Sequence, residues 1–139
     1  MFQTKITEMF GIKYPIIVGT MMHLAKAEMV AAASNAGALG TLASAMFPSK
    51  EDFRKEVRRT KDLTDKPFAV NLNLFPAMRP VDNREYMGVI FEEGIKIVET
   101  SGHKAPEDLA DDLKRHGVIL VHKCVGVRYA LKAESIAAR

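Results

Sequence analysis

Three polar residues interrupt apolar runs of the sequence, and their side chains could contact a ligand. Asn71 and Asn73 alternate with apolar residues in the run 67–75, which places both amides on the same face of a strand. A buried amide needs a hydrogen-bonding partner, either the backbone or the polar edge of a planar ligand. Lys123 lies near the end of another apolar run, where an ammonium is costly unless it meets an anion or solvent. A ligand contact and simple exposure at the strand end both stay open for Lys123.

Methionines occur in two short segments that follow apolar runs. Met21 and Met22 follow the run 15–19, and Met46 follows the run 38–43. Thioethers pack well against a flat aromatic ring, but they are equally common in an ordinary core. The methionines alone therefore leave a ring-binding role and a packing role open.

The sequence gives no support for a phosphate-binding loop, a nucleophilic catalytic set or a metal site. The segment NAGALG (35–40) runs from an expected helix into an expected strand, whereas a phosphate-binding loop runs from strand to helix. It therefore predicts a tight turn. The sequence has no G-x-x-x-x-G-K-[ST] motif, and no Ser/His/Asp or Cys/His set is legible. Its four histidines lack metal-ligand spacing, so no metal site is predicted.

The elements that must position these residues alternate regularly along the chain. Strands are expected at 15–19, 38–43, 67–75, 95–100 and 118–124. Helices are expected at 24–35, from Ser49, from Asp82 to Gly94, at 106–117 and at 127–139. Strands that are almost continuously apolar are covered on both faces, which indicates a parallel sheet with crossover helices.

The length of 139 residues corresponds to one domain, with no linker or second domain. Two α/β architectures fit: an open five-stranded doubly wound parallel sheet, or five βα units of a TIM (β/α)8 barrel. A complete barrel needs roughly 200 residues or more. In both architectures the chemistry occurs at the carboxyl ends of the strands, which here are followed by residues 19–23, 44–46, 71–75, 99–102 and 122–124.

Composition narrows the function further. The net charge is +3, and the densest basic patch, 54–61, is interleaved with acids, so a nucleic-acid partner is not expected. The apolar runs are too short to span a membrane, and the N-terminus lacks the apolar region of a secretory signal. A single cysteine, Cys124, fits the reducing cytoplasm.

Long motifs in order along the chain resemble those of a known family. They are ITEMFGIKYPII (6–17), AEMVAAASNAGALG (27–40), PFAVNLNL (67–74), IVETSG (97–102), VHKC (121–124) and ALKAES (130–135). These segments are similar to the opening of the nitronate monooxygenases, formerly 2-nitropropane dioxygenases, which are FMN-dependent TIM barrels. The resemblance covers essentially the whole chain. It implies that residues 1–139 form a single partial barrel domain that stops before strand six.

The resemblance also implies a set of flavin-binding residues. It places Thr20, Met21 and Met22 beside the isoalloxazine, Asn73 in polar contact with the flavin, and Asn71 nearby. Lys123 would lie near N1 and the C2 carbonyl, where a cation stabilises the negative charge of reduced flavin. The family's histidine base and its phosphate-binding loops are expected beyond the chain end, so no catalytic residue is assigned here.

The activity that the resemblance implies is oxidation of alkyl nitronates with molecular oxygen. Two alternatives stay open: an NAD(P)H-dependent quinone or enoyl-thioester reductase of the same barrel family, or a truncated fragment without catalysis. A small molecule is the expected partner. The first and fifth strands would have unpaired edges, which could support self-association.

Overall fold

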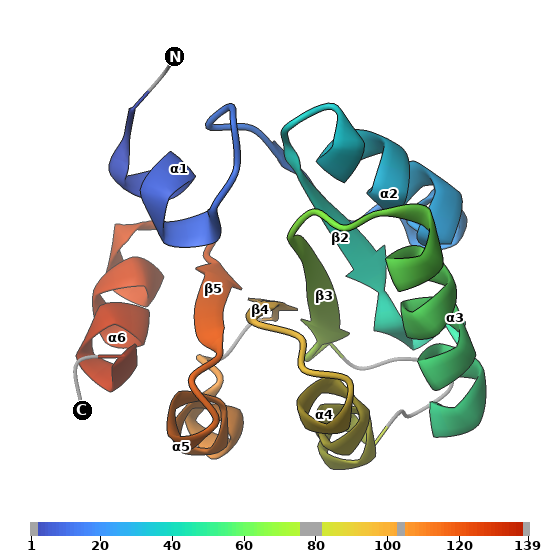
Figure 1. Cartoon of the computed structure of the whole chain (residues 1–139). Coiled ribbons are helices and arrows are strands. Elements are labelled where there is room, and N and C mark those ends of the chain that lie inside the picture. The colour runs from blue at the N-terminus through green and yellow to red at the C-terminus, as the bar shows by residue number, and fades with distance from the viewer. Residues whose placement is uncertain (1–2, 76–81, 103–104, 138–139) are drawn as a thin grey trace.

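The computed structural model describes residues 3–75, 82–102 and 105–137, and within them helices alternate with five strands. Figure 1 shows the chain with its elements labelled. The strands are β1 (Ile17–Val18), β2 (Leu39–Ala43), β3 (Phe68–Asn73), β4 (Ile97–Ser101) and β5 (Ile119–Lys123). The α-helices are α1 (Lys5–Phe10), α2 (Ala27–Asn35), α3 (Lys50–Leu63), α4 (Asn83–Glu92), α5 (Glu107–Arg115) and α6 (Val127–Ala137), with short 3₁₀ helices η1 (Met22–Leu24) and η2 (Ser44–Met46).

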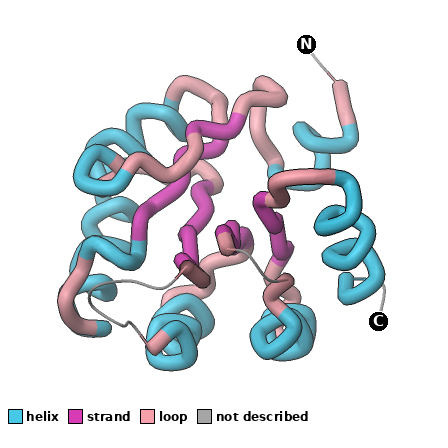
Figure 2. The backbone as a smooth tube through the Cα atoms, turned by 180° about the vertical axis from the view of Figure 1, so that it is seen from behind, coloured by secondary structure: helices cyan, strands magenta, loops and turns pink. Residues whose placement is uncertain are grey.

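The order of the strands decides between the two expected architectures. All neighbouring strands are parallel, and their order in the sheet is β1-β2-β3-β4-β5. A doubly wound sheet reverses direction from an internal strand, so the prediction of an open doubly wound sheet is wrong. The strands curl into a half-barrel with helices α2 to α6 outside it, seen from opposite sides in Figures 1 and 2. The prediction of five βα units of a TIM barrel is confirmed.

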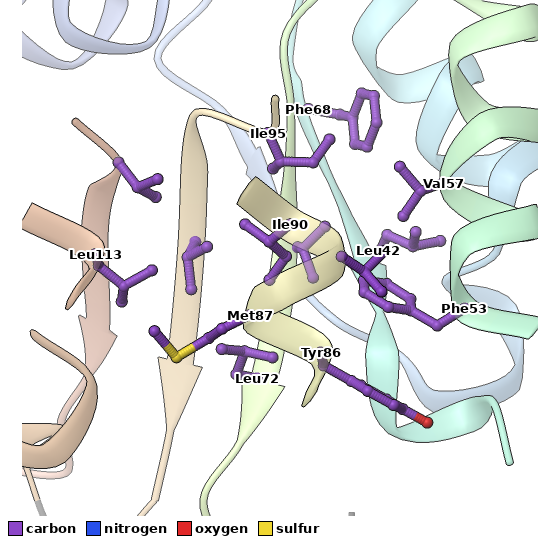
Figure 3. Close-up of a cluster of buried hydrophobic side chains, with 14 of the residues drawn as sticks. Leu42, Phe53, Val57, Phe68, Leu72, Tyr86, Met87, Ile90, Ile95 and Leu113 are labelled. Carbon is purple, nitrogen blue, oxygen red and sulfur yellow. The ribbon is translucent and has the colours of Figure 1, made fainter. Parts of the chain in front are cut away.

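The main core lies between the outer face of the curled sheet and the helices (Figure 3). Leu42, Val70 and Val98 project from successive strands toward this core. On the helical side, Phe53 of α3 and Ile90 of α4 are fully buried. Helix α3 begins where the sequence predicts it. The Ser49 hydroxyl accepts a hydrogen bond from the backbone N–H of Asp52, as a capping residue does.

The glycine-rich segment 35–40 is structural, as predicted. Gly37 follows helix α2 with φ +96°, a conformation that residues with a side chain rarely adopt. Gly40 lies in β2 directly against α2, and a Cβ atom there would come within 2.3 Å of the carbonyl oxygen of Val30. The two glycines therefore permit the tight turn and the close contact between helix and strand.

Helix α1 was not predicted from the sequence. Its six residues begin at a capping box formed by Thr4 and Thr7, a pair of hydroxyl residues. Phe10 at its end and Ile12 just beyond it pack against inward-facing residues near the amino ends of the strands, namely Leu39, Ala69 and Ile97. This second, smaller core covers the amino end of the inner face and leaves the carboxyl end for polar residues.

The last expected helix is present as α6, and its final two residues, 138–139, lie outside the described part of the chain. Among the described residues, no helix combines the length and the apolar character needed to cross a membrane.

Candidate functional site

Polar side chains occupy the inner face of the half-barrel at the carboxyl ends of the strands. Asn71 of β3 pairs in register with Glu99 of β4, and Ser101 pairs with Lys123 of β5. Residues two apart on a strand share a face, so Asn73 and Ser101 continue this face by one further row. Sequence periodicity placed Asn71 and Asn73 on one face correctly, and the parallel register adds Glu99 and Lys123 to it.

Glu99 is the centre of this arrangement. Its Oε1 accepts hydrogen bonds from Asn71 Nδ2 at 2.8 Å and from Thr20 Oγ1 at 3.2 Å. The Lys123 ammonium lies 3.0 Å from the same oxygen, as an ion pair. We call Thr20, Asn71, Glu99 and Lys123 the Glu99 cluster. Its members come from four different βα units, so the curl of the sheet is what brings them together.

The two charges of the ion pair differ in burial. The Glu99 side chain is 6% exposed and the Lys123 side chain is 48% exposed. A carboxylate this deeply buried is costly unless donors surround it, and the cluster supplies three of them. The half-exposed ammonium keeps contact with the space above the strands. Lys123 thus meets an anion, Glu99, and is also half exposed, whereas a ligand contact of Lys123 stays a prediction.

A further set of hydrogen bonds fixes Asn71 within the cluster. Its side-chain nitrogen also donates to Ser101 Oγ at 3.3 Å, and its backbone carbonyl oxygen accepts from Ser44 Oγ at 2.6 Å. Asn71 and Ser44 are both buried. The amide therefore has a defined orientation, with its nitrogen toward Glu99.

Asn73 lies outside the Glu99 cluster. Its Oδ1 accepts a hydrogen bond from the backbone N–H of Phe75 at 3.2 Å, and its carbonyl oxygen accepts from Asn83 Nδ2 at 3.0 Å. These contacts organise the turn after β3. A flavin contact of Asn73 stays a prediction.

The loop after β1 brings the two predicted methionines to the surface near Thr20. Met21 and Met22 are 40% and 63% exposed, and Met22 has φ +36°, in the left-handed region that residues with a side chain seldom adopt. Backbone strain of this kind is concentrated at ligand sites. The Thr20 hydroxyl donates to Glu99, so the first part of this loop is attached to β4. The thioethers of Met21 and Met22 follow Thr20 and are exposed.

The histidines in the described part of the chain do not join the cluster. His122 points to the opposite face of β5, where its Nδ1 lies 2.8 Å from the hydroxyl oxygen of Thr100. Burial lowers the pKa of His122 below its ordinary value, and the hydrogen bond with Thr100 partly opposes that shift. His103 lies outside the described residues. Among the residues that are described, no group of His, Cys, Asp or Glu could hold a metal ion.

Glu99 is the site residue that the sequence reasoning missed. It lay within one of the segments expected to follow the strands, 99–102, but it was given no role. The signal in the sequence is a carboxylate toward the end of the apolar run 95–100. Asn71 and Lys123 are likewise polar residues within the apolar runs 67–75 and 118–124. Three polar residues at the ends of successive parallel strands meet at one edge, and an amide and an ammonium need an acceptor there.

Comparison with known proteins identifies the family. A sequence model described as "Nitronate monooxygenase" matches residues 3–138. This chain belongs to the nitronate monooxygenase family. The recognition made from its motifs is confirmed, and the chain is of an oxidoreductase family.

Individual relatives in this family carry different names. A (3aS,4S,5R,7aS)-5-hydroxy-7a-methyl-1-oxo-octahydro-1H-indene-4-carboxyl-CoA dehydrogenase of Rhodococcus jostii is 31% identical over 96% of this chain, which spans 36% of that protein. A probable nitronate monooxygenase of Staphylococcus saprophyticus is 42% identical over 50% of this chain and 19% of its own length. The chain thus spans about a third or less of these relatives' length.

A solved structure supports the fold. FabK from Thermotoga maritima superposes with a TM-score of 0.87 and 26% identity, over 98% of this chain and 42% of that one. The half-barrel described above is therefore an arrangement that also occurs within a longer chain.

Proposed function

We propose that these five βα units form the flavin-contacting part of an FMN-dependent oxidoreductase that oxidises alkyl nitronates with molecular oxygen. One observation carries the proposal: a half-exposed Lys123 ammonium is anchored by buried Glu99 at the carboxyl edge of a nitronate monooxygenase half-barrel. A fixed cation at that edge suits a ligand whose polar rim accepts negative charge.

The residues present are chemically suited to FMN. Lys123 would face N1 and the C2 carbonyl of the isoalloxazine, and the exposed thioethers of Met21 and Met22 offer soft contacts for a flat ring. Asn73 would add a polar contact from the turn after β3. When bound, FMN would supply the electron transfer that an anionic nitronate needs before it reacts with oxygen. The protein's part is to bind the ring, orient it and bias its charge.

A titration of FMN into the purified chain tests the binding step. Quenching of flavin fluorescence should saturate at one FMN per chain, and Lys123→Ala should weaken that binding because the anionic rim loses its cation. An affinity that Lys123→Ala leaves unchanged would remove Lys123 from the proposed site. A chain that shows no saturable quenching at all would refute the binding proposal for this chain.

A second candidate function is reduction with a nicotinamide cofactor, on a quinone or a thioester substrate. It is favoured by the relative named as a carboxyl-CoA dehydrogenase, which aligns over almost the whole chain. The two candidates differ in their reductant. Oxygen consumption with propyl nitronate supports the first, whereas bleaching of bound flavin by NADH or NADPH supports the second.

We also propose that the edge strands allow self-association. In the described sheet β1 and β5 each have one neighbour, and Ile16 and Ile17 are exposed at the β1 edge. Unpaired edges with apolar side chains invite pairing. Light scattering during gel filtration should show species larger than 15.4 kDa. A monomer at all concentrations would refute self-association. The single Cys124 leads us to place the protein in the cytoplasm.

A further inference from the structure

We infer that Glu99 is a positioning residue that holds the Lys123 ammonium at the carboxyl edge of the barrel and partly neutralises its charge. A flavin bound there would then contact an ion pair instead of a free cation. The inference rests on the proposed function, and it adds a residue that sets how strongly the site favours negative charge on its ligand.

The surroundings of Glu99 give it a fixed place. Thr20, from the loop after β1, and Asn71, from β3, donate to the same carboxylate oxygen that meets Lys123. Asn71 is itself held by Ser101 and Ser44. The carboxylate is buried and bonded from several βα units, whereas the lysine has a long, half-exposed side chain. Glu99 therefore determines where the Lys123 ammonium lies, and the reverse does not hold.

The geometry leaves Lys123 able to contact a ligand while it stays paired. An ammonium has three N–H donors, and Glu99 Oε1 at 3.0 Å uses one of them. Within the described ranges, the contact with Glu99 is the ion pair that Lys123 makes, so two donors remain toward its exposed side. A ligand oxygen or nitrogen could then be bound by Lys123 without separation of the ion pair, which would leave a buried carboxylate without its cation.

The charge of Glu99 has a direct consequence for a redox ligand. A carboxylate beside the ammonium reduces the positive potential at the rim, so negative charge on reduced flavin is stabilised less than by a free lysine. Glu99→Gln removes the charge but keeps an acceptor oxygen for Thr20, Asn71 and Lys123. We expect this variant to bind reduced FMN about tenfold more tightly relative to oxidised FMN, which raises the two-electron midpoint potential by about 30 mV.

Three variants separate charge from packing. Glu99→Asp keeps the negative charge on a side chain one methylene shorter, so its potential should stay closer to the wild type than that of Glu99→Gln. Glu56→Gln is the matched control. Glu56, on α3, is also largely buried, and its carboxylate accepts a hydrogen bond from the backbone N–H of Ala27 at 2.8 Å. Its described hydrogen bond and ion pair involve no member of the Glu99 cluster. Lys123→Met leaves the carboxylate without its cation and should lower the potential and weaken FMN binding more than tenfold.

The experiment measures midpoint potentials by equilibration with a reference dye, and unfolding by urea without FMN. Support requires a raised potential for Glu99→Gln, a smaller rise for Glu99→Asp and an unchanged potential for Glu56→Gln. It also requires that the double variant of Glu99→Gln and Lys123→Met change the free energy of unfolding by less than the sum of the two single changes. The last measurement needs no flavin. If Glu99→Gln does not fold, the double variant of Glu99→Gln and Lys123→Met carries the test. It should be more stable than Lys123→Met alone, whose carboxylate lacks its cation, and a double variant that is no more stable overturns the inference.

The outcomes distinguish the inference from the function on which it rests. A wild-type chain that takes up no FMN refutes the proposed function and this inference with it. A wild-type chain that binds FMN, with a Glu99→Gln potential equal to or below its own, refutes the inference alone. Additive unfolding effects of Glu99→Gln and Lys123→Met also overturn it, because the two side chains would then not be coupled.

Discussion

Replacement of Asn71 by aspartate tests whether Glu99 is a charged acceptor inside the half-barrel. The Asn71 amide nitrogen lies 2.8 Å from Glu99 Oε1 and is buried. Asn71→Asp replaces the side-chain NH2 group, which donates to Glu99 and Ser101, by a carboxyl oxygen with almost no change in size. The variant therefore places two carboxyl groups in direct contact, where the wild type has a hydrogen bond.

The size of the effect follows from the contact distance. Two unit charges separated by the 2.8 Å of this contact repel by about 6 kcal/mol at an effective dielectric constant of about 20. The introduced carboxyl avoids that repulsion by keeping its proton and donating it to Glu99. With the ordinary aspartate pKa of about 3.9, this costs about 4 kcal/mol at pH 7 and about 1.5 kcal/mol at pH 5. We therefore expect Asn71→Asp to lose roughly 3–4 kcal/mol of unfolding free energy at pH 7 and much less at pH 5.

Urea unfolding followed by circular dichroism at both pH values measures this loss. Asn73→Asp is the matched control, because Asn73 shares the strand and the face but uses its Oδ1 as an acceptor from Phe75, a role that aspartate retains. It should change the free energy of unfolding by less than about 1 kcal/mol at either pH. An Asn71→Asp loss that is independent of pH, or as small as that of the control, would refute the ionised Glu99 contact.

The remaining predictions concern the scaffold and are all measured by urea unfolding. Gly40→Ala should lose about 3 kcal/mol because its Cβ would meet the Val30 backbone, whereas Gly88→Ala, with open space around it in α4, should be neutral or stabilising. Phe53→Ala should lose about 3–5 kcal/mol because Phe53 is fully buried in the main core. Burial lowers the pKa of His122, so the unfolded chain takes up that proton first as the pH falls below about 6.5 and stability drops. His122→Asn should reduce this loss between pH 7 and pH 5.5.

The succession of elements could be predicted from the sequence because the local signals were strong. The apolar runs marked the five strands, and the capping hydroxyl of Ser49 and the glycines after the helices marked helix ends. Helix α1 escaped prediction because its cap uses a hydroxyl, Thr7, where the usual capping box has a carboxylate, and because six residues give little periodicity. The order of the strands could not be read from the pattern. Both architectures produce the same alternation, and only the pairing of strands separates them.

The site was predicted less completely than the fold. Asn71 and Lys123 stood out because each is a polar residue in an apolar strand, and the structure joins them through Glu99. Glu99 was overlooked because its role depends on register, and register between parallel strands is not encoded in any single strand. The flavin contacts expected for Met21 and Met22 remain predictions, and the exposure of both side chains is consistent with them.

The distribution of polar and apolar residues along the inner face is consistent with the ligand site that we propose at the Glu99 cluster. At the amino ends of the strands the same face is mostly apolar, with Leu39, Ala69 and Ile97 packed against α1 and one buried hydroxyl residue, Thr41, beside Ala69. A buried ion pair adds little stability compared with apolar residues of similar volume, and losing one partner is strongly destabilising. An apolar residue at position 99 would therefore stabilise the fold at least as well, as Leu39, Ala69 and Ile97 do at the amino ends of the strands. The ammonium of Lys123 is held by Glu99 yet stays half exposed at the carboxyl edge, where the proposed flavin site would place a negative or electron-accepting group.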